Sequence, residues 1–597
     1  MSEHGSARLP LSAAQTGVWV GQQLAPDSPL YNCGTYLEIS GRIDAALLTE
    51  AVRRTVAETE ALRVRFTEDA DGVWQIVEPP GDVPVPVLDV SGAPDPQATA
   101  RAWMADDLAT PTDPRTGPLY THALLRTARE RSLLYFRHHH IALDGYAQSV
   151  YCARLAQIYT ALAAGQEPRP ARFRPLAELL DEDRAYRTSA RHDEDRTHWH
   201  DTFADHPEPA SLTGRAAAPG PALARRTVRL SGEQGSRLAH AGRWPAVLVA
   251  AVAAYVHRLT AAPDVVVGLP LTGRTTALAL STPAMLANEL PLRFSVTGRT
   301  TLAGLVRQAT DQIAGALRHQ RYRGEDLRHH LNLSGATGGL HSVTVNAMSF
   351  GQKIRFGDHE TTVRPLSTGP VHDLHVASYG DPATSGDGVQ LEFGGNPALY
   401  AERELAAHQD RFVAFLDDLV ADPAAPVGSV DLFGAGERRR VLVEWNDTAA
   451  EVVPGTLPEL FEAQVVRTPD AVAVVAGDVG VSYAELDARA NRLAHHLVGR
   501  GVGPESVVGV CLERGVELVV ALLAVMKAGG AYLPIDPDFP AERIDFMLRD
   551  AGPVAVVTSV ACDGPVFEGT ARIVLDDPST VAALTASETT AVGRSLR

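Results

Sequence analysis

The chain has 597 residues, of which 45% are apolar and 21% charged, so it can bury sizeable cores and is not a disordered polypeptide. Its net charge of −18 disfavours nonspecific binding to nucleic acid or to an anionic membrane surface. Four cysteines without a CxxC pair indicate a reducing compartment, and no signal peptide or membrane span is visible. We therefore expect a cytoplasmic protein, with about four compact units at roughly 150 residues each.

Helix and strand patterns alternate along the chain. Apolar residues spaced three or four apart predict helices over 46–63 and 150–162, and an alanine-rich apolar run predicts a buried helix over 247–259. Short apolar runs predict buried strands over 133–137 and 265–269. The fold class is therefore α/β. Pro, Ala and Gly are concentrated in the predicted surface connections 163–175, 206–224 and 422–455.

The predicted strand 133–137 runs directly into three histidines and then into Asp144 and Gly145. A rigid strand end aims catalytic side chains well, and an imidazole there can act as a base near neutral pH, because its unperturbed pKa is about 6.5. Asp144 can turn back to order the loop. Gly145 permits a backbone conformation that is closed to other residues. The segment is the strongest candidate for a catalytic site.

Two plainer interpretations of the histidines compete with catalysis. On a strand His138 and His140 share one face while His139 points away, so only two of them converge. No nearby Cys or Glu pattern completes a zinc set, so we predict no metal site. A structural histidine cluster is the other alternative.

The segment 139–145 resembles the HHxxxDG signature of nonribosomal peptide synthetase condensation domains. An HxxxD motif alone is shared with chloramphenicol acetyltransferase-like enzymes, so the specificity comes from further matches. These are an SxAQ-like opening at 11–19, an LR-x-RF strand at 62–66, an xNxxPL motif at 288–292, an HQxY element at 319–322 and a strand asparagine at 345–346. The resemblance covers 8–435 and is strongest to condensation domains of the enterobactin synthase type.

The last part of the chain resembles the start of an adenylation domain, with two of that family's core motifs at 481–486 and 526–536. The family's phosphate loop, ATP-contacting aspartate and catalytic lysine have no counterpart in the sequence. The resemblance implies two chloramphenicol acetyltransferase-like lobes in a V shape, followed by a partial adenylate-forming subdomain. The implied limits are 8–180 for the N-lobe, 181–435 for the C-lobe, 436–455 for a linker and 456–597 for the truncated adenylation subdomain.

The resemblance implies an acyltransferase that forms an amide bond between a donor acyl or peptidyl thioester and an acceptor aminoacyl thioester. Both substrates are expected on phosphopantetheine arms of carrier proteins, with no covalently bound cofactor. In this family the second histidine of the motif contacts the reacting groups, and the matching residue here is His140. Its role is open between a general base and a group that orients the amine.

The same resemblance implies roles for five more residues. Asp144 is expected to have a structural role and to pair with Arg274 across the cleft. His139 is expected to pack inward. The Gly145 amide is a candidate for holding the tetrahedral oxyanion, and Asn346 is expected to line the acceptor side.

Only about eight residues precede the predicted condensation domain, so we expect an upstream carrier protein to deliver the donor in trans. The acceptor is expected on a downstream carrier domain of a full-length synthetase. An aryl-capped donor such as dihydroxybenzoyl fits a siderophore-type system, and peptidyl or fatty-acyl donors stay open. Competing hypotheses are an epimerisation domain, an HxxxD acyltransferase that uses acyl-CoA, and a catalytically silent recruitment platform.

Overall fold

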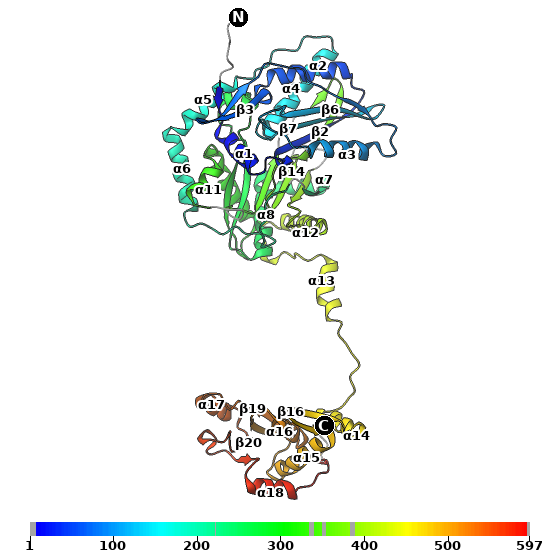
Figure 1. Cartoon of the computed structure of the whole chain (residues 1–597), viewed down its shortest axis with the longest axis vertical. Helices are drawn as coiled ribbons and strands as arrows, with labels where there is room; N and C mark the ends of the chain where they lie inside the picture. The colour runs from blue at the N-terminus through cyan, green and yellow to red at the C-terminus, as the bar shows by residue number, and fades with distance from the viewer. Residues whose placement is uncertain (1–7, 221–222, 334–338, 349–353, 383–388, 594–597) are drawn as a thin grey trace. The chain divides into compact units, whose positions relative to one another are not determined.

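A computed structural model describes residues 8–220, 223–333, 339–348, 354–382 and 389–593 (Figure 1). The chain forms two compact units, Met1–Glu444 and Trp445–Arg597. The first unit holds two lobes, each built on a six-stranded sheet, and the second is a smaller α/β unit. Length alone suggested about four units, but the two lobes share strands and ion pairs and so count as one. Among the described residues, no helix combines the length and apolar character that crossing a bilayer requires.

The N-lobe sheet has the strand order β12-β13-β2-β7-β6-β5. Its strands are β2 (Asn32–Ser40), β5 (Val87–Asp89), β6 (Tyr120–Ala128), β7 (Arg131–His139), β12 (Arg355–Phe356) and β13 (His359–Ser367). Alternation along β7 separates two cores. Leu134 and Phe136 pack with residues of α2 (Ala45–Glu58) and α4 (Gly145–Ala163), whereas Leu133 and Tyr135 pack with α3 (Pro96–Leu108). A three-stranded sheet, β1 (Arg8–Pro10), β4 (Gly72–Val77) and β3 (Val64–Asp69), and helix α1 (Ala13–Leu24) complete this lobe.

Strands β12 and β13 come from late in the chain but belong to the N-lobe sheet. β13 pairs antiparallel with β2, with Val363 opposite Leu37. The sequence division into consecutive lobes did not anticipate this exchange, because strand pairing between distant segments leaves no local pattern. The predicted limits of the lobes, linker and adenylation subdomain stay predictions.

The C-lobe sheet has the order β10-β9-β11-β14-β15-β8. Its strands are β8 (Ala224–Arg229), β9 (Asp264–Leu271), β10 (Asn288–Ser295), β11 (Val343–Met348), β14 (Leu374–Tyr379) and β15 (Gln390–Gly395). Helix α8 (Trp244–Thr260) is buried over most of its length, as its apolar sequence predicts. Further helices of the first unit are α5 (Leu176–Arg187) and α9 (Ala277–Ser281), which pack against the N-lobe core, and α6 (Ala190–Phe203), α7 (Gly232–Ala241), α10 (Leu302–Arg318), α11 (Gly324–His330) and α12 (Glu402–Ala421).

The predicted elements of the N-lobe differ from the observed ones mainly at their ends. The helix predicted over 46–63 stops at Glu58, and a 3₁₀ turn, Glu60–Arg63, replaces its last part. The strand predicted over 133–137 continues to His139, because β2 pairs with it as far as that residue. Helix α4 begins at Gly145, because the Asp144 carboxylate caps it by accepting a hydrogen bond from the Ala147 amide (2.9 Å).

Helix α13 (Ala435–Leu442) begins at the last residue of the predicted C-lobe and continues into the predicted linker. The second unit has a four-stranded parallel sheet of order β19-β18-β20-β21 and a β16-β17 hairpin. The strands are β16 (Val472–Ala476), β17 (Val479–Ser482), β18 (Val507–Cys511), β19 (Ala531–Pro534), β20 (Ala555–Thr558) and β21 (Arg572–Val574). The helices are α14 (Leu457–Arg467), α15 (Tyr483–Gly499), α16 (Val516–Lys527), α17 (Ala541–Ala551) and α18 (Pro578–Ala586). The remaining 3₁₀ turns are Pro29–Tyr31, Val427–Ser429, Glu444–Asn446 and Pro565–Phe567.

Candidate active site

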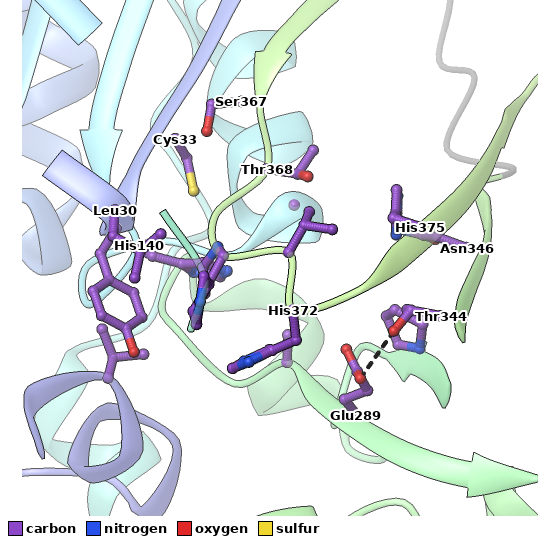
Figure 2. Close-up of a pocket in the computed structure, with 18 of the residues that line it drawn as sticks. Leu30, Cys33, His140, Glu289, Thr344, Asn346, Ser367, Thr368, His372 and His375 are labelled. Atoms are coloured by element: carbon purple, nitrogen blue, oxygen red, sulfur yellow. Dashed lines mark hydrogen bonds between the residues drawn. The ribbon is translucent and has the colours of Figure 1, made fainter. Parts of the chain in front are cut away.

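A cavity of about 2160 Å³ is lined by residues of both lobes of the first unit. Of the residues singled out from sequence, His140, Gly145 and Asn346 line it, together with His138. Figure 2 shows His140 on one side of this cavity and Asn346 on the other, near strand β14. The candidate residues therefore divide into a group that faces the cavity and a group that lies behind its wall.

Residues 138–145, called the catalytic loop after the role expected from sequence, lead from the end of β7 into α4. His139 is buried behind it and is bonded through both ring nitrogens. Its Nδ1 accepts from the Ile141 amide (3.2 Å), so its Nε2–H donates to Oε1 of Gln22 (3.1 Å). Burial lowers the pKa of His139 to about 3, with the charge of His140 acting in the same direction. A neutral imidazole that is bonded through both ring nitrogens holds the loop in place.

His140 is half-buried at the cavity wall, and its amide donates to the Tyr31 carbonyl (2.8 Å). Burial lowers the pKa of the His140 imidazole, and the nearby Asp144 charge acts in the opposite direction. The ring is therefore neutral near pH 7 and able to accept a proton. Gly369 packs against it, since a Cβ there would lie 2.9 Å from Cδ2 of His140. The φ of +97° at Gly369 also favours glycine, so two constraints meet at this position.

Asp144 lies behind the wall and joins the two lobes. Its Oδ2 accepts from Nη1 of Arg274 (2.7 Å) and from the amides of Leu286 and Ala287 (2.9 Å each), while Oδ1 caps α4 through the Ala147 amide. Both charged side chains are excluded from solvent. Burial alone would raise the pKa of Asp144, but the Arg274 charge and these hydrogen bonds hold it below its usual range. A permanently charged, fully bonded carboxylate fixes the loop relative to the C-lobe.

Gly145 is the first residue of α4 and is exposed in the cavity wall. It is not among the described glycines with positive φ, so the special backbone conformation expected from sequence is not needed here. The helix that Asp144 caps gives this residue an ordinary conformation. Glycine instead leaves this part of the cavity wall without a side chain.

Two further sequence motifs, the SxAQ-like opening and the xNxxPL motif, make hydrogen bonds to the backbone around the cavity. Ser12 and Gln15 form a capping box at α1, and Nε2 of Gln15 donates to the Ile141 carbonyl (3.3 Å) in the catalytic loop. In the xNxxPL motif, Asn288 donates from Nδ2 to the carbonyls of Gln320 (2.9 Å) and Tyr322 (2.7 Å). The side chains of both motifs therefore hold neighbouring backbone segments in place through hydrogen bonds.

Sequence reasoning missed the polar side chains of the opposite wall. Glu289, His341, Thr344 and His375 line the cavity on the C-lobe side. The sequence signal that could have identified this wall is one polar residue in each of three otherwise apolar segments, namely Glu289, Thr344 and His375. Among the described residues, no group of three or more His, Cys, Asp or Glu side chains is arranged to hold a metal ion.

Two family profiles match the chain. "Condensation domain" covers residues 6–442, and "AMP-binding enzyme" covers residues 461–594. Three curated relatives align with nearly the whole chain. They are a dimodular nonribosomal peptide synthase of Bacillus subtilis (40% identity, 96% of this chain and 24% of the relative), an isonitrile lipopeptide synthase of Streptomyces coeruleorubidus (39%, 96% and 39%) and enterobactin synthase component F of Escherichia coli (33%, 94% and 43%). The chain thus spans less than half the length of each of these relatives.

Solved structures of similar fold match the first unit at useful sequence identity. The starter condensation domain of rhizomide synthetase, crystallised with C8-CoA, has a TM-score of 0.69 at 37% identity and covers 72% of this chain and 98% of that chain. The first condensation domain of the calcium-dependent antibiotic synthetase, in complex with a substrate analogue, has a TM-score of 0.67 at 38% identity and covers 72% and 100%.

Proposed function

The chain belongs to the condensation-domain family of nonribosomal peptide synthetases, which form amide bonds. From this premise we propose that His140 is the catalytic residue that contacts the reacting groups in the cavity. The observation that carries the proposal is a neutral imidazole on a braced loop, facing a cavity that both lobes line. The partial adenylation region that follows belongs to the AMP-binding enzymes.

In the proposed reaction the acceptor amine attacks the donor thioester carbonyl. A C–N bond forms, the C–S bond breaks, and the donor thiol leaves. As a general base His140 takes the amine proton and returns it to the departing thiolate, an effect typically worth about 10²–10⁴-fold. As a positioning group it would only orient the amine towards the carbonyl. The lowered pKa of His140 supports the base role, because it keeps the imidazole unprotonated at neutral pH.

The other residues are proposed to support this step. Asp144 and Arg274 keep the catalytic loop in register with the C-lobe, as their buried ion pair suggests. The Gly145 amide is proposed to stabilise the tetrahedral oxyanion, which its place at the start of α4 favours. Asn346 is proposed to line the acceptor side, since it lies on the wall opposite His140.

The substrates are proposed to arrive on phosphopantetheine arms of carrier proteins. The cavity is large enough for a thioester and an amine together, as its volume indicates. Delivery of the donor by a separate carrier stays a prediction, as does the carrier that holds the acceptor. The relatives support a fatty-acyl or an aryl-capped donor, because one solved relative binds C8-CoA and another relative is an enterobactin synthase component.

A direct test uses the purified chain with an octanoyl or dihydroxybenzoyl donor and an aminoacyl acceptor. Each donor is offered on a carrier protein and as acyl-CoA, and the amide is measured by mass spectrometry. Product from carrier-bound substrates supports the proposal. Product only from acyl-CoA and a free amine would favour an HxxxD acyltransferase, and no product with any donor would favour a recruitment platform.

For the second unit we propose that this chain activates no amino acid by itself. The matched region 461–594 has the fold's first motifs, but the sequence contains no phosphate loop or catalytic lysine of the family. We expect no amino-acid-dependent ATP–pyrophosphate exchange from the purified chain. Robust exchange with any amino acid would overturn this interpretation.

A further inference from the structure

The C-lobe side of the cavity carries a polar cluster that the proposed reaction does not use. We call Glu289, His341, Thr344 and His375 the polar wall. Figure 2 shows Glu289, Thr344 and His375 together on the side of the cavity away from His140. All four residues line the same cavity as His140.

Strand register explains why the polar wall forms. Thr344 on β11 is paired with His375 on β14 and with Gly268 on β9. Gly268 in turn is paired with Pro291 on β10, two residues from Glu289. Since side chains two residues apart share a face, these strands present their polar residues on one face of the sheet.

The contacts within the polar wall centre on one carboxylate oxygen. Thr344 Oγ1 donates to Oε1 of Glu289 (3.1 Å), and Nε2 of His341 lies 3.3 Å from the same oxygen. Gly268 provides the space, because a Cβ there would lie 2.5 Å from Cε1 of His341 and 2.9 Å from Oε1 of Glu289. Any larger residue at 268 would displace the pair, so the strand sequence builds this cluster.

Within the described part of the chain, no guanidinium or ammonium group forms an ion pair with Glu289. Its side chain is 46% exposed in the wall, and among the described residues it forms an ion-pair contact only with His341. Burial lowers the pKa of His341, and Glu289 only partly opposes that effect, so the imidazole is neutral near pH 7. Arg328 also lines the cavity but makes no ion pair with Glu289 in the described part of the chain.

His375 adds an unused polar atom. The residue is 7% exposed, and its buried Nε2 has no hydrogen-bond partner in the described part of the chain. Burial lowers its pKa to about 4, so it is a neutral group near pH 7. A buried polar atom without a partner is costly, so this imidazole adds an unsatisfied polar group to the wall.

We propose that the polar wall is a specificity subsite for a hydrogen-bond-donating group, an ammonium or a hydroxyl, in the acyl part of one of the two thioester substrates. An uncompensated carboxylate beside neutral imidazoles attracts N–H and O–H donors. It disfavours an aliphatic chain of the same shape, because that chain would leave the wall's polar groups unsatisfied. The inference rests on the proposed function and names a property of the same cavity.

The test compares isosteric substrates on the wild type and on Glu289→Gln. The acceptor arm uses pantetheine thioesters of norleucine and ornithine, and of valine and threonine. The donor arm uses heptanoyl, 6-aminohexanoyl and 6-hydroxyhexanoyl thioesters. On one arm we expect the wild type to prefer a polar member, and Glu289→Gln to lower kcat/KM for it by about 10- to 100-fold while the aliphatic twin changes less than about twofold.

Matched variants separate the polar wall from general damage. Glu325→Gln neutralises another cavity carboxylate, one already paired with Arg323, and should leave the selectivity unchanged. Gly268→Ala should displace His341 and reduce the selectivity, with the melting temperature measured alongside. If Glu289→Gln lowers kcat/KM equally for the polar and the aliphatic substrate of a pair, or changes neither on either arm, the proposed specificity subsite is wrong. Absence of product from every wild-type pair would instead overturn the proposed function.

Discussion

The two walls of the cavity differ in how completely their carboxylates are bonded. In the catalytic loop, Asp144 accepts four hydrogen bonds and His139 is bonded through both ring nitrogens. In the polar wall, the charge of Glu289 has no guanidinium or ammonium partner within the described residues. Unpartnered ring nitrogens occur on both walls, Nε2 of His375 on one and Nδ1 of His140 on the other. Closed networks hold a geometry, whereas open ones have capacity left for a ligand. Substitution of the fully bonded residues Asp144 and His139 should therefore cost stability, whereas substitution of Glu289 in the polar wall should cost selectivity.

The largest effect is expected from His140→Ala, which removes the proposed reacting group. Amide formation should fall by about 10²–10⁴-fold, while the melting temperature stays nearly unchanged, because the loop is held by other residues. Product formation with loaded carriers and a thermal melt measure the two quantities.

Ser149→Ala is a suitable control, since Ser149 lines the same cavity on α4. Its activity should stay close to that of the wild type. Substantial condensation by His140→Ala would remove the base role and leave at most a positioning one.

Asp144→Asn should break the closed network and reduce both stability and activity. Leaving Arg274 buried without its charged partner costs about 3–5 kcal/mol of unfolding free energy. Urea unfolding measures the loss. The control is Glu178→Gln, which breaks the exposed pair with Arg174 and should cost at most about 1 kcal/mol. A variant at 144 as stable as the wild type would show that the network does not hold the lobes.

Lowering the pH should reduce the free energy of unfolding, because His139 is buried in its neutral form. The pKa of His139 is lowered to about 3 by burial, below its usual 6.5. Its contribution to stability is therefore complete above about pH 6.5 and is lost as the pH falls, by about 1.4 kcal/mol for each pH unit. Urea unfolding at pH 7, 6 and 5 should give a shallower pH dependence for His139→Gln than for the wild type.

The exposed His200→Gln is the matched control for this slope and should follow the wild type. Identical pH dependences for all three proteins would show that His139 is not kept neutral by the fold.

The smallest effect on stability is expected from Glu289→Gln. The carboxylate is partly exposed and takes part in an open network, so its unfolding free energy should stay within about 0.5 kcal/mol of the wild type. Chemical unfolding beside the selectivity assay measures both. A loss comparable with that of Asp144→Asn would mean that the two walls do not differ as described.

The sequence predicted the α/β class and, through family resemblance, the contact between Asp144 and Arg274. The catalytic role of residues 138–145 stays a prediction. Local patterns carried the elements, because a helix or strand repeats its apolar residues over a few neighbours. The predicted ends of the helices and strands were less accurate than their positions along the chain. Strand β7 runs on to His139 because β2 pairs with it, a contact that the local sequence does not contain.

What the sequence by itself determined is the grouping of residues 139–145 in one short segment, since a contiguous motif needs no fold to bring its members together. Tertiary structure alone decided that β12 and β13 join the N-lobe sheet. It alone also decided that Glu289, Thr344 and His375 face one cavity. The physical reason is register: residues on β10, β11 and β14 become neighbours only when strands far apart in the chain pair, with Gly268 leaving room between them.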